Sequence, residues 1–286
     1  MKIIYKHTWR LMGLVVLIQA VSCVEEYWPE FGVKYEDVLV VDGMITNDPG
    51  PYKITLSKST SLESPQHISL VGYTITIFDN FGNSETLLEL GGGEYITSEN
   101  GIQGIPGRSY QVQIVSPDGV TYASSFEKMK SPVGIDSVHV EYESIEDLDF
   151  PYDLEGYRFY ISSLPSPHDT TFFLWKLTGT YKYNANHYIK YMYDGQMHFF
   201  SPYDSLYTCW RTYKVPEIFT YSLTNLSEPL VKNFPLHFVN TEDKKLSIRY
   251  SLLTRQYVIT QQAHKYWKNL HEQSTELGSM FSVLPF

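Results

Sequence analysis

Short runs of alternating apolar and polar residues, separated by turn-forming clusters, recur at regular spacing from about residue 37 onward. The runs VLVV, YKITLSKS and YTITIFD are rich in β-branched residues and lie beside the turn clusters NDPG and DNFG. Later runs are separated by GGG and by PDG. Runs of strand length without a helical period between them predict antiparallel strands joined by tight turns. We therefore predict an N-terminal immunoglobulin-like antiparallel β-sandwich over residues 37–130.

A second unit is predicted from residue 131, where a Ser-Pro dipeptide begins a stretch of different composition. It also contains strand-like runs, of which KLSIRYSLL is the clearest. Near its end, apolar residues recur at helical spacing and predict one amphipathic helix near 261–277, packed against a sheet. We expect residues 131–286 to form a second antiparallel β domain that includes this helix. The helical positions are Ala263, Tyr266, Trp267 and Leu270, and Gly278 is the predicted stop.

The first 22 residues have the features of a lipoprotein signal peptide. Three basic residues precede an apolar run from Leu11 to Ile18, which is shorter than the roughly 20 residues needed to cross a membrane. The small residues AVS before Cys23 resemble a bacterial lipobox, so we predict lipidation of Cys23 and a tether over residues 23–36. Ordinary signal peptidase cleavage, which would release a soluble chain, remains the alternative. Because a lipidated sulfur cannot form a disulfide, the other cysteine, Cys209, is expected to be a lone buried thiol.

The charge balance bears on the class of partner. Removal of the three basic residues in 1–22 leaves 19 basic and 32 acidic residues, a net charge of −13. Nucleic acid is therefore not an expected partner, because its binding normally demands a basic surface. The chain is also rich in aromatic residues, with 24 tyrosines, and its charged content is moderate, so we expect a folded chain.

Residues 181–210 hold an unusual density of tyrosine, histidine and asparagine. Exposed aromatic side chains suit stacking on sugar rings or contact with a protein partner, because each offers a large rigid surface with a polar tip. Half-buried strands also favour Tyr and Phe, so strand propensity is the competing explanation. Strand alternation is expected to turn some of these rings into the core. The candidate contact residues are Tyr188, Tyr191, Tyr193 and Trp210.

No recognised catalytic motif is present: the sequence has no G-x-S-x-G elbow, H-E-x-x-H pair, paired-cysteine metal site or P-loop. The acidic run at 141–155 lacks the ligand spacing and turn glycine of a calcium loop and is interpreted as a solvated face. His264 and His271 would lie about 10 Å apart on a helix, too far to share a metal directly. We therefore predict a non-catalytic protein with no cofactor and no metal. The alternative is a surface hydrolase acting on glycans, which would need two facing carboxylates that sequence cannot reveal.

Several segments, taken in order, resemble the domain of unknown function 4249 family. They are the lipobox-like AVSC, then VLVVDGMITNDPGPYKITLSKS, GEYITSENGIQGIPGRSYQVQI, DGVTYASSF, the CW dipeptide at 209 and 210, and IRYSLLTRQYVITQQAHKYWKNLHEQSTELGSMF. The resemblance covers nearly the whole mature chain.

The resemblance implies an outer-membrane lipoprotein of Bacteroidota, often encoded beside a TonB-dependent transporter and without established catalytic residues, so only Cys23 carries over as a site. The two glutamates after Cys23 resemble the export signal that directs such lipoproteins to the outer face, with a merely solvated tether as the alternative. Family members usually continue past GSMF into a further strand, whereas this chain stops at Phe286. The resemblance thus implies either a lost tail or an incomplete final sheet.

Overall fold

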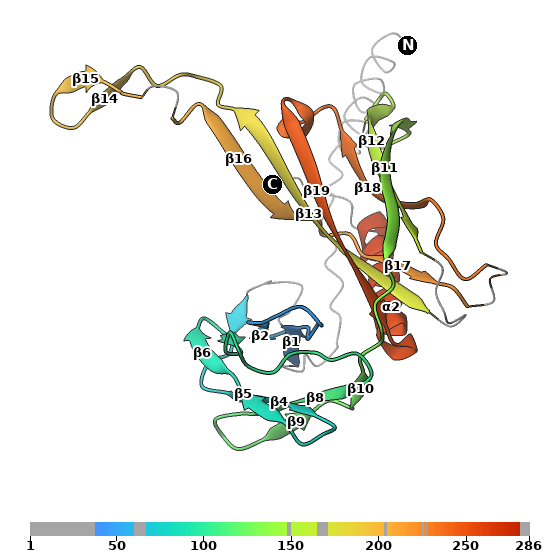
Figure 1. Ribbon diagram of the computed structural model, residues 1–286. Coiled ribbons are helices and arrows are strands. Elements are labelled where there is room, and N and C mark those ends of the chain that lie inside the picture. Colours follow the sequence, from blue (N-terminus) through green and yellow to red (C-terminus); the bar gives the residue numbers. More distant parts are fainter. Residues whose placement is uncertain are drawn as a thin grey trace, which may run out of the picture. The chain divides into compact units, whose positions relative to one another are not determined.

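The computed structural model describes residues 38–59, 67–147, 150–164, 171–202, 205–224, 226 and 228–280. Cys23, the predicted signal peptide and the predicted tether lie outside these residues. The described chain consists mainly of antiparallel β-sheets with a single α-helix near its C-terminal end, which confirms the predicted fold class (Figure 1). None of the helices in this part of the chain is both long enough and apolar enough to cross a membrane.

The first ten strands form two five-stranded sheets. One sheet has the order β1-β2-β7-β6, with β3 paired to β2, and the other has the order β10-β8-β4-β5, with β9 paired to β8. The bounds of the first sheet are β1 (Leu39–Gly43), β2 (Lys53–Lys58), β3 (Ile68–Ser69), β6 (Leu88–Gly91) and β7 (Glu94–Ile96). Those of the second are β4 (Thr74–Asp79), β5 (Ser84–Thr86), β8 (Ser109–Val115), β9 (Thr121–Ala123) and β10 (Glu127–Lys128).

Each of these sheets buries one face, as period-2 alternation requires. Ile54 on β2 and Ile77 on β4 are buried and line a common cavity, so the two sheets face each other. The turns follow the glycines predicted from the sequence: Gly82 and Gly119 have φ of 88° and 87°, a region that residues with a Cβ rarely adopt. Turn chemistry and alternation together are therefore sufficient to explain the sandwich.

The later strands form a three-stranded sheet of order β11-β12-β18 and a four-stranded sheet of order β16-β13-β17, in which β19 pairs with β13. Strand β13 is central, because β19 runs along one side from Phe172↔Ile259 to Lys182↔Arg249 while β17 and β16 share the other side. A separate ribbon is formed by β14 and β15. The bounds are β11 (Ile135–Ile145), β12 (Leu154–Ser163), β13 (Phe172–Asn184), β14 (Tyr191–Tyr193), β15 (Met197–Phe199), β16 (Thr208–Lys214), β17 (Phe219–Ser222), β18 (Phe234–Asn240), the 3₁₀ helix η1 (Lys244–Leu246) and β19 (Arg249–Ile259).

A hydrophobic core lies between these two sheets. Trp175 on β13 is almost fully buried, and its ring stacks on Phe173 and on Phe234 of β18, with centroid distances of 5.6 and 4.8 Å. Its indole N–H donates to Gln256 Oε1 at 2.9 Å, so the polar atom is also satisfied. The other buried members of the core are Ile161, Leu177, Val215, Leu223, Val231 and Leu236.

The helix α2 (Gln261–Met280) packs against β13 and β17. The Phe172 and His264 rings lie 5.0 Å apart, and Lys176 Nζ lies 5.2 Å from the centre of the Trp267 ring. Burial lowers the pKa of His264, and the nearby positive charge of Lys268 lowers it further. These contacts place His264 against the sheet.

Candidate contact surface

An extended hairpin connects β13 to β16 and carries the four sequence-predicted contact residues. We call residues 185–210 the aromatic hairpin; residues 203 and 204 within it are not among those described. Its outer part is the β14–β15 ribbon, in which Tyr191 pairs with Phe199 and Tyr193 with Met197. Figure 1 shows this ribbon beyond the ends of β13 and β16. Gly195, with φ of 115°, allows the tight turn between its strands.

All four predicted residues are exposed. The exposed fractions are 49% for Tyr188, 52% for Tyr191, 75% for Tyr193 and 55% for Trp210. The expectation that alternation would turn some of them into the core is wrong. For Tyr191 and Tyr193 the reason is architectural, because every residue of β14 and β15 is exposed and both faces of the ribbon are open to solvent. Trp210 lies on β16, where most residues are also exposed.

Ring contacts within the hairpin order these side chains without burying them. The Tyr188 ring stacks on Tyr207 with a centroid distance of 3.7 Å, and Tyr191 lies 4.8 Å from Phe199. At the base, Lys182 Nζ lies 5.8 Å from the centre of the Trp210 ring. Aromatic pairs of this kind contribute about 0.5–1.5 kcal/mol beyond area burial, so the rings are presented in a partly fixed arrangement.

Sequence reasoning missed two residues of this surface. Met197 and Phe199 on β15 are exposed to 72% and 75%, as much as Tyr193 opposite Met197. Large exposed apolar side chains that lie together are the feature that marks interaction sites. The sequence signals the hairpin but not its register: Asp194-Gly195 between two short aromatic runs is typical of a hairpin turn, and the structure closes it with three residues, 194–196, so that Tyr193 pairs with Met197.

Few charges accompany the rings. In β14, β15 and the turn between them, the acidic and basic residues are Asp194 and His198. Both side chains are exposed, and the Oδ2 and Nε2 atoms lie 3.4 Å apart. The surface is thus suited to contacts through aromatic and apolar area, although the chain as a whole is acidic.

A polar cluster in the second part of the chain is the strongest alternative as a chemical site. Tyr213 Oη lies 3.3 Å from His237 Nε2 and 2.9 Å from Tyr250 Oη, and His237 Nδ1 lies 3.3 Å from Glu217 Oε1. Burial alone would raise the pKa of Glu217, but the adjacent His237 ring, together with the Glu217 backbone N–H group, lowers it. A Cβ added to Gly179 would come within 2.6 Å of Tyr213 and Tyr250, so the cluster fills the space above that glycine. This packing assigns the cluster a structural role in joining β13, β16, β18 and β19.

Two carboxylates, those of Asp79 and Glu85, line a cavity in the first part of the chain. The pKa of Asp79 is lowered to about 2, mainly by the Asn83 side-chain amide, which donates at 2.7 Å. Burial would raise the pKa of Glu85, yet the backbone N–H groups of Ser98 and Ile102 donate to it at 2.6 and 2.5 Å and lower the pKa. A glycosidase acid needs a raised pKa, so both groups are unsuited to that role.

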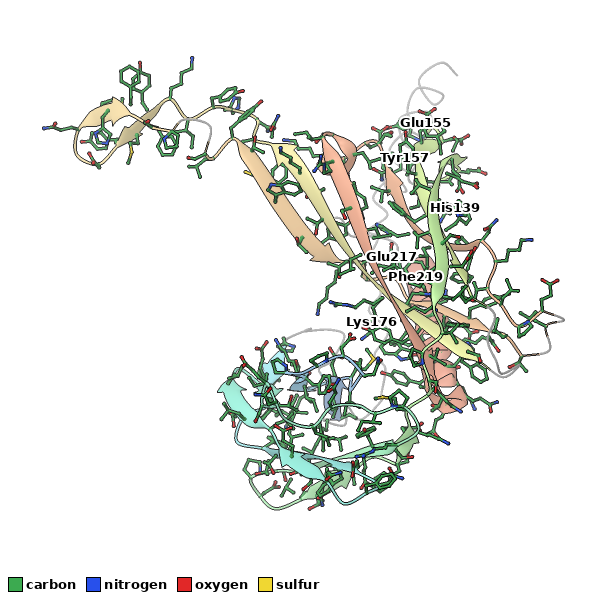
Figure 2. All side chains as sticks on the ribbon, viewed as in Figure 1. His139, Glu155, Tyr157, Lys176, Glu217 and Phe219 are labelled. Atoms are coloured by element: carbon green, nitrogen blue, oxygen red, sulfur yellow. The ribbon has the colours of Figure 1, made fainter. Side chains whose placement is uncertain are left out.

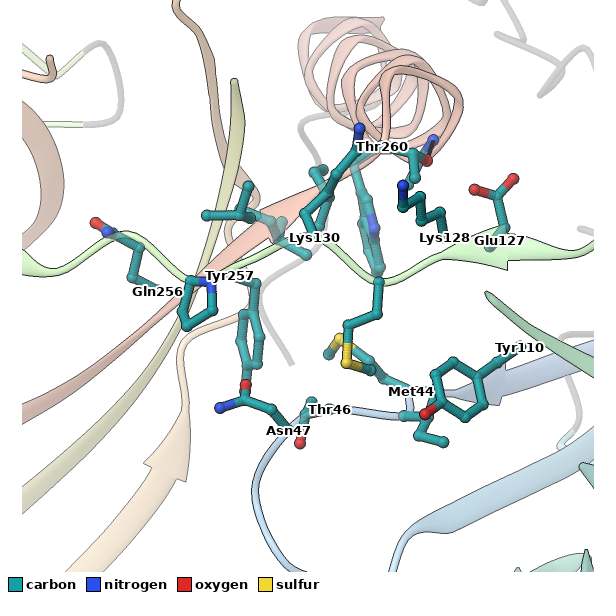
Figure 3. Close-up of a pocket in the computed structure, with 18 of the residues that line it drawn as sticks. Met44, Thr46, Asn47, Tyr110, Glu127, Lys128, Lys130, Gln256, Tyr257 and Thr260 are labelled. Carbon is teal, nitrogen blue, oxygen red and sulfur yellow. Dashed lines mark hydrogen bonds between the residues drawn. The ribbon is translucent and has the colours of Figure 1, made fainter. Parts of the chain in front are cut away.

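A further pocket, of about 330 Å³, holds one carboxylate, Glu127, beside Lys128 and Lys130 (Figure 3). Its size is at the lower end for small-molecule sites, but a single carboxylate does not make the pair that glycoside hydrolysis requires.

The side chain of Cys209 is half-buried, whereas the sequence predicted a buried thiol. Its Sγ atom lies 3.6 Å from the Leu206 carbonyl oxygen.

Among the described residues, no group of three or more His, Cys, Asp or Glu side chains could hold a metal ion.

Comparison with known protein families places the chain. The family described as Domain of unknown function (DUF4249) matches residues 24–286. No curated protein and no solved structure matches the chain.

Proposed function

The chain belongs to the domain of unknown function 4249 family, and on that premise we propose that it is a non-catalytic lipoprotein of the outer membrane that uses the aromatic hairpin to bind a TonB-dependent transporter in nutrient uptake. The anchor is the diacylglyceryl-modified Cys23, and the chain faces outward. The single observation that carries the proposal is the exposure of Tyr188, Tyr191, Tyr193 and Trp210 on one extended hairpin.

The physical argument rests on the energy that such rings can supply. Interfaces depend on a few residues, which are enriched in Tyr and Trp, and charged residues are depleted at their centres. The hairpin has this composition. The ordering of Tyr188 by Tyr207 and of Tyr191 by Phe199 reduces the entropy lost on binding.

A membrane anchor makes a modest interface sufficient. Tethering two partners to one surface converts their encounter into an event of high effective concentration, so affinity in solution can be weak. Several acyl chains hold a protein lastingly, because buried hydrocarbon contributes about 0.8 kcal/mol per CH₂. The lipid is tested separately: a fatty-acid analogue should label the wild-type chain, and Cys23→Ala should abolish the label. Partition of the wild-type chain into the aqueous phase of a detergent extraction would contradict the anchor.

The interaction is tested by purifying the chain from native membranes in mild detergent. We expect a TonB-dependent transporter to co-purify, and alanine at Tyr188, Tyr191, Tyr193 and Trp210 to reduce its recovery at least tenfold. The matched control is Tyr122→Ala on β9, an exposed tyrosine away from the hairpin, which should leave recovery unchanged. Recovery of the chain alone after crosslinking, together with turnover of a glycan by the purified protein, would contradict the proposal and support the hydrolase alternative.

A further inference from the structure

Strand β11 forms an open edge of its sheet. It pairs with β12 from Ile135↔Ser163 to Ile145↔Leu154, and no strand in the described part of the chain pairs with its other side. Val138, Val140 and Tyr142 are 44%, 45% and 55% exposed. Figure 2 shows His139 on this strand.

Edges of this length are usually protected. Natural proteins use charged side chains, above all lysine, as well as proline, bulges or shortness to prevent a second chain from adding to an edge. Strand β11 has 11 residues, contains neither lysine nor proline, and is irregular only between Ile135 and Ser137. Its charged side chains are acidic, so a partner strand must place no carboxylate opposite them. Its backbone is therefore available to a further strand.

We propose that β11 pairs antiparallel with β11 of a second copy of this chain, with the two-fold axis at Val140. This register aligns the two strands over their full length, with the irregularity between Ile135 and Ser137 near one end, because Val140 is the middle of the strand. His139 then lies opposite Glu141 of the other copy, and Val138 lies opposite Tyr142. The remaining pairs are Ile135 with Ile145, Asp136 with Ser144, and Ser137 with Glu143.

The order of residues along the strand favours a second copy in this register, through its charges and through its length. In the proposed register no acidic residue faces another acidic residue directly, although the chain carries a net charge of −10. In an antiparallel pair of identical strands, the hydrogen-bond pattern requires the two-fold axis to pass through a residue. The neighbouring registers therefore move the axis from Val140 to His139 or to Glu141. The register centred on Glu141 places that carboxylate opposite itself, and like charges in direct opposition destabilise a sheet. The register centred on His139 loses the pairing of His139 with Glu141 and leaves the last two residues of the strand, Ser144 and Ile145, without an opposite residue in the other strand.

The contacts that the β11 side chains make within one copy are compatible with this pairing. Glu143 accepts from Arg158 Nε at 2.7 Å and from the Tyr160 hydroxyl, so its charge is compensated within the copy. His139 stacks on Tyr160 with a centroid distance of 5.4 Å and lies 3.4 Å from Glu141, and both groups remain accessible. On the other face, the exposed Val138, Val140 and Tyr142 would be partly covered by their counterparts, with Tyr142 already against Tyr157.

Cysteine crosslinking tests the register in the full chain in its membranes, with Cys209→Ser as the parent. Directly opposed residues have Cα atoms about 4.5–5.5 Å apart, within the range for a disulfide, so Val140→Cys should give a dimer on a non-reducing gel. Tyr142→Cys is the matched control, because the residues at position 142 in the two copies would lie about 13 Å apart along the strand. Co-expression of Val138→Cys and Tyr142→Cys copies should restore the crosslink. Equal crosslinking at 140 and 142, or none at 140 above the parent, would overturn the proposal.

A charge reversal tests the complementarity in the detergent-extracted chain. His139→Glu places two acidic residues opposite each other twice per dimer, and we expect the dimer dissociation constant to rise about tenfold. The double variant His139→Glu with Glu141→Lys places opposite charges across the dimer and should return the constant to near the wild-type value. Sedimentation equilibrium measures both, and circular dichroism checks the fold. A wild-type monomer at all concentrations, or no recovery in a folded double variant, would contradict the pairing.

Discussion

Strand β13 and the aromatic hairpin that follows it are built from the same kinds of residue but have opposite environments. Phe173 and Trp175 on β13 are buried, whereas Tyr191, Tyr193 and Phe199 in the hairpin are exposed. Strand β13 has paired strands on both sides and packs against a second sheet, while β14 pairs only with β15 among the described strands. The number of layers around a strand, and not its aromatic content, therefore decides whether its rings stabilise the fold or remain available for contact.

Removing the central ring of the buried strand should have the largest effect. Trp175→Ala deletes a side chain that stacks on Phe173 and Phe234 and leaves Gln256 without its hydrogen-bond donor. We expect a loss of about 3–5 kcal/mol in the free energy of unfolding, measured by chemical denaturation. A loss below about 1 kcal/mol would mean that β13 is not the core strand.

A smaller loss is expected where the buried strand has no side chain. Gly179→Ala directs a Cβ into the Tyr213 ring and the Tyr250 hydroxyl, which are held together by a hydrogen bond of 2.9 Å. Overpacking of this kind costs about 1–3 kcal/mol. Thermal unfolding of the variant should show a lowered midpoint, and an unchanged midpoint would show that the polar cluster can move aside freely.

Carboxylates in the two regions should also differ in how much they contribute to the pH dependence of the unfolding free energy. The pKa of Glu217 in the polar cluster is lowered from 4.5, because burial, which would raise it, is outweighed by the adjacent His237 ring and the Glu217 backbone N–H group. A depressed carboxyl pKa stabilises the folded state above the unfolded-state value, and this stabilisation is lost as the pH falls below 4.5 and through the folded-state pKa. Glu217→Gln should therefore reduce the dependence of unfolding free energy on pH in that window. Asp194→Asn in the hairpin, which changes an exposed carboxylate to an amide in the same way, is the matched control.

Truncation at the tip of the hairpin should have the smallest effect on stability. Tyr193→Ala removes a ring that is 75% exposed, and we expect a change within about 0.5 kcal/mol in the free energy of unfolding. Denaturant titration beside Trp175→Ala gives the direct comparison. A loss above about 2 kcal/mol would show that the ring packs against part of the chain.

The sequence predicted local features well, because turns and periodicity depend on neighbouring residues. Gly82 and Gly119 lie in the expected turns, and the apolar spacing at Ala263 and Trp267 corresponds to a helix that packs against a sheet. The exposure of Tyr191 was not predictable in the same way. It depends on which strands and sheets meet, and such contacts join residues far apart in the chain. The half-buried state of Cys209 was missed for the same reason.

The central claim is that the exposed hairpin, and not the chain surface in general, contacts a transporter. The most direct measurement is crosslinking in cells with a photoreactive amino acid introduced in place of Tyr193, compared with the same group in place of Tyr122. We predict a crosslinked product at position 193 whose partner is identified by mass spectrometry as a TonB-dependent transporter, and no such product at position 122. Identical products at both positions, or none at position 193 when the variant accumulates at the wild-type level, would contradict the claim.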